Sequence, residues 1–404
     1  MKNSNDELKK RGDRIFLSTY SRYPAAMIKG RGTTLFDADG HEYLDFLAGI
    51  AVCSLGHCHP AVTKAICDQA GKLVHASNLY YLEPQVRLGE LICENSFAEK
   101  VFFANSGAEA NEAAIKLARL HGGTGRYQVI SLSGSFHGRT LATLAATGQP
   151  KFHLGFEPMP TGFLHAPFGD IGALEEMICD ETCAILCEPL QGEGGVLLLD
   201  MDYLRAIRDL CDKYGLLLIF DEIQTGIGRT GTFFSYEQFG VTPDILTMAK
   251  AIGNGLPLGA MVTRADIGAS FTPGSHGSTF GGNPVACAAA VAVLEVMLAH
   301  GFLDEVKAKG AYFRGELQKL VERFPTILSG VRGMGLILGA ILDKDHVAHG
   351  PDIVNALFER GFLINFAGNT VLRFLPPLVV GREEIDRLIT ALAEVLSGLK
   401  SRQR

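Results

Sequence analysis

The chain has 404 residues, of which 47% are apolar and 20% charged, and its formal net charge is −7. A chain of this length can bury a large core and usually forms more than one domain. Its acidic balance leaves no strongly basic face, which argues against a nucleic-acid partner.

The N-terminal stretch, residues 1–16, is charged and has no apolar core, so we do not expect a secretory signal. No uninterrupted apolar run in the chain is long enough to span a bilayer, which argues against a membrane partner. The nine cysteines include no C-x-x-C pair and their number is odd, which favours reduced thiols. These features predict a soluble, cytoplasmic protein.

Residues 32–49, "GTTLFDADGHEYLDFLAG", carry an Asp-Gly pair at Asp39 and Gly40 between two short strand-like runs. Asp-Gly between such runs is typical of a β-hairpin. We therefore predict a hairpin near the N-terminus.

The middle of the chain repeats one pattern, a short apolar run followed by a polar or glycine-rich loop. The run Val101–Ala104 turns at Ser106 and Gly107 into a helix, and four more runs follow, in residues 127–138, 183–195, 215–228 and 244–255. Strands that are apolar throughout are buried on both faces, which predicts a mostly parallel sheet between helices. The carboxyl ends of such strands meet at one edge, where ligands bind. We expect all these loops at that edge.

After about residue 290 the pattern changes to amphipathic helices, followed by one predicted strand in residues 330–342 and another in 370–380. The predicted fold class is α/β, with a mixed, mostly parallel sheet in a large domain of residues 61–290. Residues 1–60 and 291–404 are expected to form a smaller α+β domain built from both ends of the chain.

Two motifs suggest other functions and are set aside. Residues 226–231, "GIGRTG", fit the dinucleotide pattern G-x-G-x-x-G, but they lie several residues past the strand and no helix with small packing residues follows. His57, Cys58 and His59, with Cys53 upstream, hint at zinc, but adjacent ligands point in different directions and no second cluster completes the set. We predict no metal site.

Lys250 raises the central question, because it interrupts an apolar run that should be buried. A buried lysine loses hydration worth several kcal/mol unless something compensates. Asp221 ends the preceding strand, and the small residues after Asn105 leave backbone N–H groups accessible at a helix N-terminus, where an anion is favoured. A lysine that loses its proton easily, a carboxylate and a phosphate site together meet the needs of pyridoxal phosphate.

With these motifs in place, the chain resembles the class-III pyridoxal-phosphate-dependent aminotransferases of fold type I over nearly its whole length. The resemblance rests on motifs that occur in order over some three hundred residues: "NSGAEANEAAIKLAR", "SFHGRT", "EPLQGEGG", "IFDEIQTGIGRTG", "MAKAIGNGLPLGA", "HGSTFGGNP" and "LRFLPPL".

The resemblance implies a role for each matching residue at the cofactor. Lys250 would link to the cofactor aldehyde and later move the substrate proton, Asp221 would hold the pyridine nitrogen, and Gln224 the ring hydroxyl. Phe136 would stack on the ring. The remaining cofactor contacts implied are Ser106, Gly107 and Ala108 at the phosphate, together with Glu222 and Ile223.

For the substrates, the resemblance implies Arg139 and Arg373 as binders of carboxylates. Glu193 would pair with Arg373 and move aside when the substrate brings a second carboxylate. Tyr20 would also contact substrate. The active site would lie at a homodimer interface, where Thr279 and Ser278 reach the site of the neighbouring subunit.

The resemblance is greatest to members that act on N-acetylornithine in bacterial arginine biosynthesis, and it implies transfer of the omega-amino group to 2-oxoglutarate. Succinyldiaminopimelate, succinylornithine, ornithine and 4-aminobutyrate remain alternative donors, because the local motifs do not separate them. A glutamate-1-semialdehyde aminomutase uses similar machinery without exchanging a keto acid. A regulator without catalysis would be expected to have an added DNA-binding segment or a broken lysine motif, and this sequence has neither.

Overall fold

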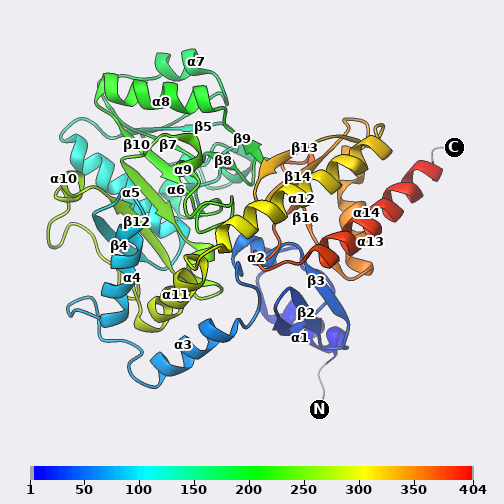
Figure 1. Cartoon of the computed structure of the whole chain (residues 1–404). Helices are drawn as coiled ribbons and strands as arrows, with labels where there is room; N and C mark the ends of the chain where they lie inside the picture. Colours follow the sequence, from blue (N-terminus) through cyan, green and yellow to red (C-terminus); the bar gives the residue numbers. More distant parts are fainter. Residues whose placement is uncertain (1–3, 403–404) are drawn as a thin grey trace.

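A computed structural model describes residues 4–402, and its largest sheet, of seven strands, lies in the left half of the molecule in Figure 1. The strand order is β4 (Lys100–Ala104), β12 (Gly259–Thr263), β11 (Ile245–Met248), β10 (Leu217–Asp221), β7 (Thr182–Cys187), β5 (Gln128–Leu132) and β6 (Phe163–Ala166). Strand β12 is antiparallel to both neighbours, and the other pairs are parallel. All strands except β12 therefore end at the same edge, which confirms the predicted mixed, mostly parallel sheet.

The strands are apolar throughout because both faces of this sheet are covered. Ile185 and Leu218 lie in register and pack toward α8 (Met201–Tyr214), whereas their neighbours Ala184 and Ile219 pack toward α5 (Gly107–Gly122). Farther along the sheet, α11 (Pro284–Met297) shares a core with β11 and β12.

Shorter elements surround this core. The helices are α3 (Pro60–Ala70), α4 (Glu83–Glu94), α6 (Leu141–Ala146), α7 (Ile171–Glu176), α9 (Tyr236–Phe239) and α10 (Ala265–Gly268), with 3-10 turns η1 (Pro150–Phe152) and η2 (Lys250–Gly253). The strands β8 (Leu190–Gln191) and β9 (Leu197–Leu198) form a small antiparallel pair.

A second sheet joins the two ends of the chain (Figure 1). Its strands are β1 (Met27–Arg31), β2 (Thr34–Asp37), β3 (Glu42–Asp45) and β15 (Phe362–Leu363). Strands β2 and β3 pair antiparallel around Asp39 and Gly40, which confirms the predicted hairpin. Strand β15 comes from the other end of the sequence and pairs parallel to β3.

A third sheet is formed by β13 (Leu328–Met334), β14 (Ile337–Leu342), β17 (Val371–Phe374) and β16 (Asn365–Ala367). The prediction of one strand over residues 330–342 is wrong, because the segment folds back at Gly335 into the antiparallel pair β13–β14. Gly335 has φ +55°, and a Cβ there would lie 2.5 Å from the carbonyl carbon of Thr230. The helices of the chain ends are α1 (Asn5–Ile15), α2 (Ala48–Ala51), α12 (Phe302–Arg323), α13 (Gly350–Glu359) and α14 (Arg382–Arg402), with the turn η3 (Val347–His349).

Within residues 4–402, no single helix has the length and composition needed to cross a membrane. Helices α11 and α12 meet those criteria only when taken together, and they are bent by 73° at the break between them.

Candidate active site

Five loops that follow strands of the large sheet meet at one cavity of about 420 Å³. Such a volume is within the usual range for cofactor and substrate sites. The cavity is lined by Asn105, Ser106, Gly107 and Ala108 after β4, Phe136 to Arg139 after β5, Glu188 and Glu193 after β7, Asp221, Ile223 and Gln224 at β10, and Ala249 and Lys250 after β11.

Lys250 is held by a strained backbone at the point where β11 turns into η2. Its φ is +48°, a conformation that costs a non-glycine residue on the order of 1 kcal/mol or more and that clusters at functional sites. Its amine makes no hydrogen bond or ion pair with any described residue. Burial lowers the pKa of Lys250, although Glu193 and Asp221 act in the opposite direction. The amine is therefore more easily deprotonated, and more nucleophilic, than an ordinary lysine.

Asp221 is buried and fixed by three donors. Its Oδ2 accepts a hydrogen bond from Asn111 Nδ2 at 2.7 Å and lies 2.8 Å from His137 Nδ1, and its Oδ1 accepts from the Ile223 N–H at 3.0 Å. Thr247 Oγ1 in turn donates to Asn111 Oδ1 at 2.7 Å, which sets the orientation of the amide. This network fixes the position of the carboxylate in the cavity wall.

Helix α5 presents its N-terminus to the cavity. Ser106 is the N-cap, and its Oγ accepts from the Glu109 N–H at 3.2 Å. The N–H groups of Gly107 and Ala108 have no acceptor among the described residues, so they remain available to an anion. A Cβ at Gly107 would lie 2.6 Å from the side chain of Ile223, so a larger residue there would force that side chain to shift.

Glu188 was not predicted as a site residue. Its Oε2 accepts from the Phe136 N–H at 3.1 Å, and its side chain lines the cavity with Asp221 and Lys250. Burial, together with the charge of Asp221, raises the pKa of Glu188 well above its usual value. A carboxylate directly after the apolar run "CAILC" was the available signal. His137 and Asn111 gave none, because their roles depend on contacts across the sheet.

Glu193, Gln224 and Arg373 form one polar cluster beside the cavity. Arg373 Nη1 donates to Glu193 Oε1 at 2.7 Å and to Gln224 Oε1 at 3.3 Å, and Gln224 Nε2 donates to Glu193 Oε1 at 3.2 Å. Arg373 is fully buried, and its Nη2 has no partner among the described residues. Burial alone would raise the pKa of Glu193, but Arg373, together with Lys250 and Gln224, outweighs burial and lowers that pKa.

Arg139 lies at the mouth of the cavity, and its side chain is exposed. No described residue forms an ion pair or hydrogen bond with its guanidinium, which instead lies over the rings of Phe136 and Phe152. It is a cation without a counter-charge and is free to receive a carboxylate.

Arg373 contacts Glu193 and Gln224 but does not itself line this cavity, and neither do four other residues implied by the resemblance. Glu222 points to the other side of β10, where its oxygens accept from the Ser235 and Tyr236 N–H groups, because successive strand residues face opposite ways. Ser278 touches only the rim, where its Oγ accepts from Asn105 Nδ2 at 3.2 Å. Thr279 is exposed.

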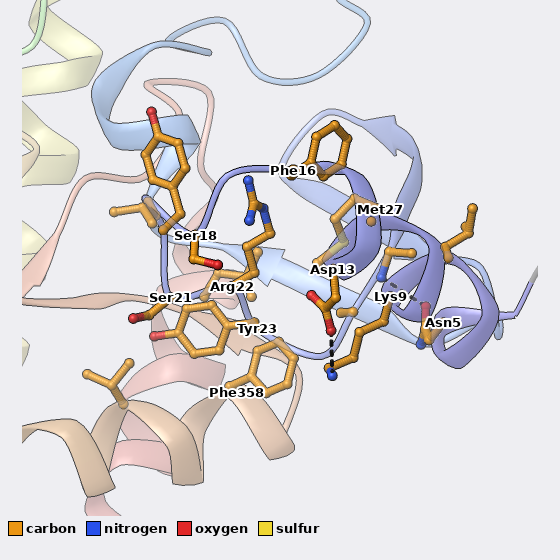
Figure 2. Close-up of a pocket in the computed structure, with 18 of the residues that line it drawn as sticks. Asn5, Lys9, Asp13, Phe16, Ser18, Ser21, Arg22, Tyr23, Met27 and Phe358 are labelled. Carbon is orange, nitrogen blue, oxygen red and sulfur yellow. Dashed lines mark hydrogen bonds and ion pairs between the residues drawn. The ribbon is translucent and has the colours of Figure 1, made fainter.

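The fourth of these, Tyr20, lines a different cavity of about 720 Å³. That cavity lies between α1 and α13 (Figure 2). In that cavity Tyr23 stacks on Phe358, with 4.9 Å between ring centroids (Figure 2). Tyr20 itself is 74% exposed, so no packing within one chain fixes its side chain near Lys250.

The donors and acceptors of the cavity fit pyridoxal phosphate. Gly107 and Ala108 offer N–H groups for the phosphate, and the fixed carboxylate of Asp221 suits a protonated pyridine nitrogen. Lys250 offers an amine without a partner for the aldehyde, and Phe136 and Ile223 offer apolar surface for the ring.

Comparisons with known families and proteins give matches over nearly the whole chain. The family model Aminotransferase class-III matches residues 17–396. The acetylornithine aminotransferase of Methanocaldococcus jannaschii is 51% identical over 388 residues, covering 95% of this chain and 96% of that protein. That of Caldanaerobacter subterraneus is 51% identical over 391 residues, covering 96% of this chain and 98% of that protein.

Solved structures of aminotransferases also superpose on nearly the whole chain. The ornithine aminotransferase of Toxoplasma gondii superposes with a TM-score of 0.94 at 34% identity, covering 99% of this chain and 96% of that one. The N-acetylornithine aminotransferase of Stenotrophomonas maltophilia superposes with a TM-score of 0.83 at 35% identity, covering 95% of this chain and 99% of that one.

Proposed function

Because the chain belongs to the class-III aminotransferases, whose cofactor is pyridoxal 5'-phosphate, we propose that it transfers the omega-amino group of N2-acetyl-L-ornithine to 2-oxoglutarate. The products would be N-acetyl-glutamate 5-semialdehyde and glutamate, in arginine biosynthesis. One observation carries the reaction type: the Lys250 amine has no partner and shares its cavity with the fixed carboxylate of Asp221 and the N-terminus of α5. The donor is supported by full-length relatives named for acetylornithine.

The residues of the cavity have different roles in this reaction. Bound pyridoxal phosphate supplies an aldehyde that takes up the substrate nitrogen and a ring that accepts electrons from the adjacent carbon. The N–H groups of Gly107 and Ala108 hold the phosphate, and Asp221 keeps the ring nitrogen protonated. Lys250 Nζ removes the proton from the substrate carbon that bears the amino group, and its lowered pKa allows it to act as that base.

Glu193 and Arg373 let one site accept two different substrates in turn. In the amine half-reaction Glu193 neutralises Arg373 at 2.7 Å, so no second carboxylate is needed there. In the second half-reaction Glu193 moves aside, and both nitrogens of the Arg373 fork, Nη1 and the unpartnered Nη2, receive a carboxylate of 2-oxoglutarate. Arg139 holds the other carboxylate at the mouth of the cavity.

A homodimer with shared active sites completes the proposal. The loop before α4 exposes large apolar side chains, with Leu79 86% and Tyr81 98% exposed, and Phe280 beside Thr279 is 61% exposed. Asn78 Nδ2 ties this loop to the backbone oxygens of Ser278 and Gly281 at 2.9 Å each. A contiguous apolar surface of this kind marks a protein interface, and in a dimer it brings Thr279 to the cavity of the second copy. We also propose a cytoplasmic location, which the nine free cysteines support.

The proposal is tested with a panel of amines and 2-oxoglutarate. We expect kcat/KM for N-acetylornithine to exceed that for free ornithine by about tenfold or more, since a site built for a polar group rejects analogues that lack it. Succinylornithine, succinyldiaminopimelate and 4-aminobutyrate complete the panel. Initial-rate lines should be parallel, as expected when one site takes both substrates in turn. A preference for free ornithine, or turnover without 2-oxoglutarate, would instead indicate one of the alternative reactions.

The role of Lys250 has a test that does not depend on activity. After loading with pyridoxal phosphate and borohydride reduction, intact-mass measurement should show the cofactor bound covalently to the wild-type chain. Lys250→Ala should show no such adduct. An adduct of equal yield on Lys250→Ala would refute the assignment.

A further inference from the structure

Arg139 is held by aromatic rings alone. Its guanidinium carbon lies 4.2 Å from the centre of the Phe152 ring and 5.4 Å from that of Phe136. Within residues 4–402 it makes no ion pair or hydrogen bond. The shorter of the two ring contacts, to Phe152, is therefore the main restraint on its orientation.

Phe152 is well placed to provide that restraint. It ends η1, and its ring meets the Phe136 ring edge-on, with 5.8 Å between centroids and 81° between planes. The following residue, His153, anchors the turn through its Nε2, which lies 2.9 Å from both Leu144 O and Thr147 O.

The turn is also fixed to the loop that carries Phe136 and Arg139. Gln149 Nε2 donates to Gly134 O at 3.2 Å and to Ser135 O at 3.1 Å, and the Gly148 N–H donates to Ser135 Oγ at 3.0 Å. The two loops therefore form one unit, in which the Phe152 ring keeps a set position relative to the cavity.

We propose that Phe152 is a positioning residue that orients the Arg139 guanidinium toward the cavity and thereby sets the affinity for the carboxylate of both substrates. This inference rests on the proposed role of Arg139. An exposed arginine samples many rotamers, and ordering it upon binding reduces affinity. A ring face that holds the cation in advance reduces that loss. Because no bond changes at Phe152, its effect belongs to substrate binding and not to the chemical step.

The experiment compares Phe152→Leu and Phe152→Tyr with a matched control, Phe156→Leu, which removes an exposed ring four residues away. We expect Phe152→Leu to raise KM for 2-oxoglutarate by about two- to fivefold, the effect of losing one exposed cation–π contact, with kcat within about twofold. Phe152→Tyr keeps a ring face and should restore the wild-type KM. Phe156→Leu should leave KM unchanged.

Binding without turnover provides a second readout. Glutarate has two carboxylates but no keto group, so calorimetry on the cofactor-loaded enzyme reports carboxylate binding alone. We expect Phe152→Leu to weaken glutarate binding by the same factor as it raises KM. In an Arg139→Gln background the same change should add nothing, because the cation that Phe152 orients is gone.

The possible outcomes distinguish the inference about Phe152 from the proposed role of Arg139. If Arg139→Gln weakens glutarate binding but Phe152→Leu does not, the inference about Phe152 is wrong and the proposed function stands. If Arg139→Gln itself leaves glutarate binding unchanged, the proposed role of Arg139 fails, and the inference fails with it. If Phe152→Leu lowers kcat with KM unchanged, its role lies in supporting Phe136, and the inference is likewise refuted.

Discussion

Arg373 and Glu193 form an ion pair beside the cavity, and either charge would destabilise the fold if it were buried without the other. Arg373 is fully buried, and an unpaired buried guanidinium would destabilise the fold by several kcal/mol. Glu193 supplies the counter-charge, and its side chain is 31% exposed toward the cavity. One partner is thus fixed and the other has room to move, as the proposed alternation of two substrates requires.

We predict that Glu193→Gln changes the two half-reactions unequally. Glutamine keeps a hydrogen bond to Arg373 but not the charge, so Arg373 would attract the substrate carboxylate in the wrong half-reaction. The amine half-reaction should slow by about tenfold or more, the scale of one lost charge-assisted contact, while the 2-oxoglutarate half-reaction is preserved. Stopped-flow absorbance of the loaded enzyme with each substrate separately measures this. An equal change in both rates would contradict the role of Glu193.

At the scale of elements, the segment between β3 and α3 is strained. Ala48, Gly49, Ile50 and Ala51 are consecutive residues with φ between +50° and +67°, a left-handed turn that L-residues disfavour. Asp45 offsets part of the cost, because its Oδ1 accepts from the Leu47 and Ala48 N–H groups at 2.9 and 2.8 Å. The turn delivers Val52 to the cavity wall.

His57 closes this segment through a pH-dependent ion pair. Its Nε2 lies 2.8 Å from Asp45 Oδ2. Burial disfavours the charged ring, but the interactions with Asp45 and Cys53 outweigh it and raise the pKa of His57 to about 10. Since the unfolded value is about 6.5, the pair stabilises the fold fully below pH about 6.5 and stops contributing as the pH rises through about 10.

We therefore predict that the difference in Tm between wild type and His57→Gln narrows as the pH rises. At pH 7 the variant should melt several degrees lower, since the loss of one buried ion-pair partner is on the order of 1–3 kcal/mol. Near pH 10 the two curves should approach each other. Thermal melts across this range measure the effect, and a constant gap would mean that the charge of His57 does not stabilise the turn.

Cys58, directly after His57, also has a left-handed backbone, with φ +53°, and its side chain is exposed. Cys58→Gly removes the steric conflict without removing buried surface, so we predict a gain of about 0.5–1 kcal/mol in the free energy of unfolding. Cys67, also exposed but inside α3, is the matched control. Cys67→Gly should cost about 1 kcal/mol. Chemical denaturation compares them, and a loss at both positions would show that strain at Cys58 is negligible.

At the scale of the molecule, Arg229 joins three separate parts of the chain. It is fully buried, and it donates to Leu336 O and Pro376 O near the C-terminal sheet and to Ser54 Oγ near the N-terminal segment. Burial lowers the pKa of Arg229 to about 9. We propose that the chain functions as a large and a small domain. The loop after β10 would connect them, because its Gln224 lines the cavity and its Arg229 binds segments near both ends of the chain.

The proposed dimer is tested by subunit complementation. A hybrid of a Lys250→Ala chain and a Thr279→Ala chain has one site with both lesions and one site with neither, if Thr279 serves the partner. Each variant alone should be nearly inactive or impaired. An equal mixture, unfolded and reassembled, should recover about a quarter of wild-type activity, since half of the dimers are hybrids with one intact site. Mixtures no more active than the parent average would show that Thr279 does not act across an interface.

Much of this architecture was predicted from local patterns. Runs that are apolar at every position predicted the buried strands, and the Asp39-Gly40 pair predicted the hairpin; the structure confirms both. The single strand predicted over 330–342 was wrong, because the apolar residues continue through the turn at Gly335 and periodicity cannot locate a reversal inside an apolar run. Lys250, Asp221 and the α5 N-terminus were identified because each interrupts or ends an apolar run, and the structure places them in one cavity.

The sequence by itself determined that two groups, Lys250 and Asp221, are expensive to bury. Only the tertiary structure decided which side chains contact Asp221 and the other polar groups of the cavity. His137 and Asn111 come to Asp221 from other strands and helices, Glu188 comes to the Phe136 backbone across the sheet edge, and Phe152 comes to Arg139 from a separate turn. The physical reason is that burial cost is a property of one residue type, whereas orientation depends on packing between segments far apart in the chain.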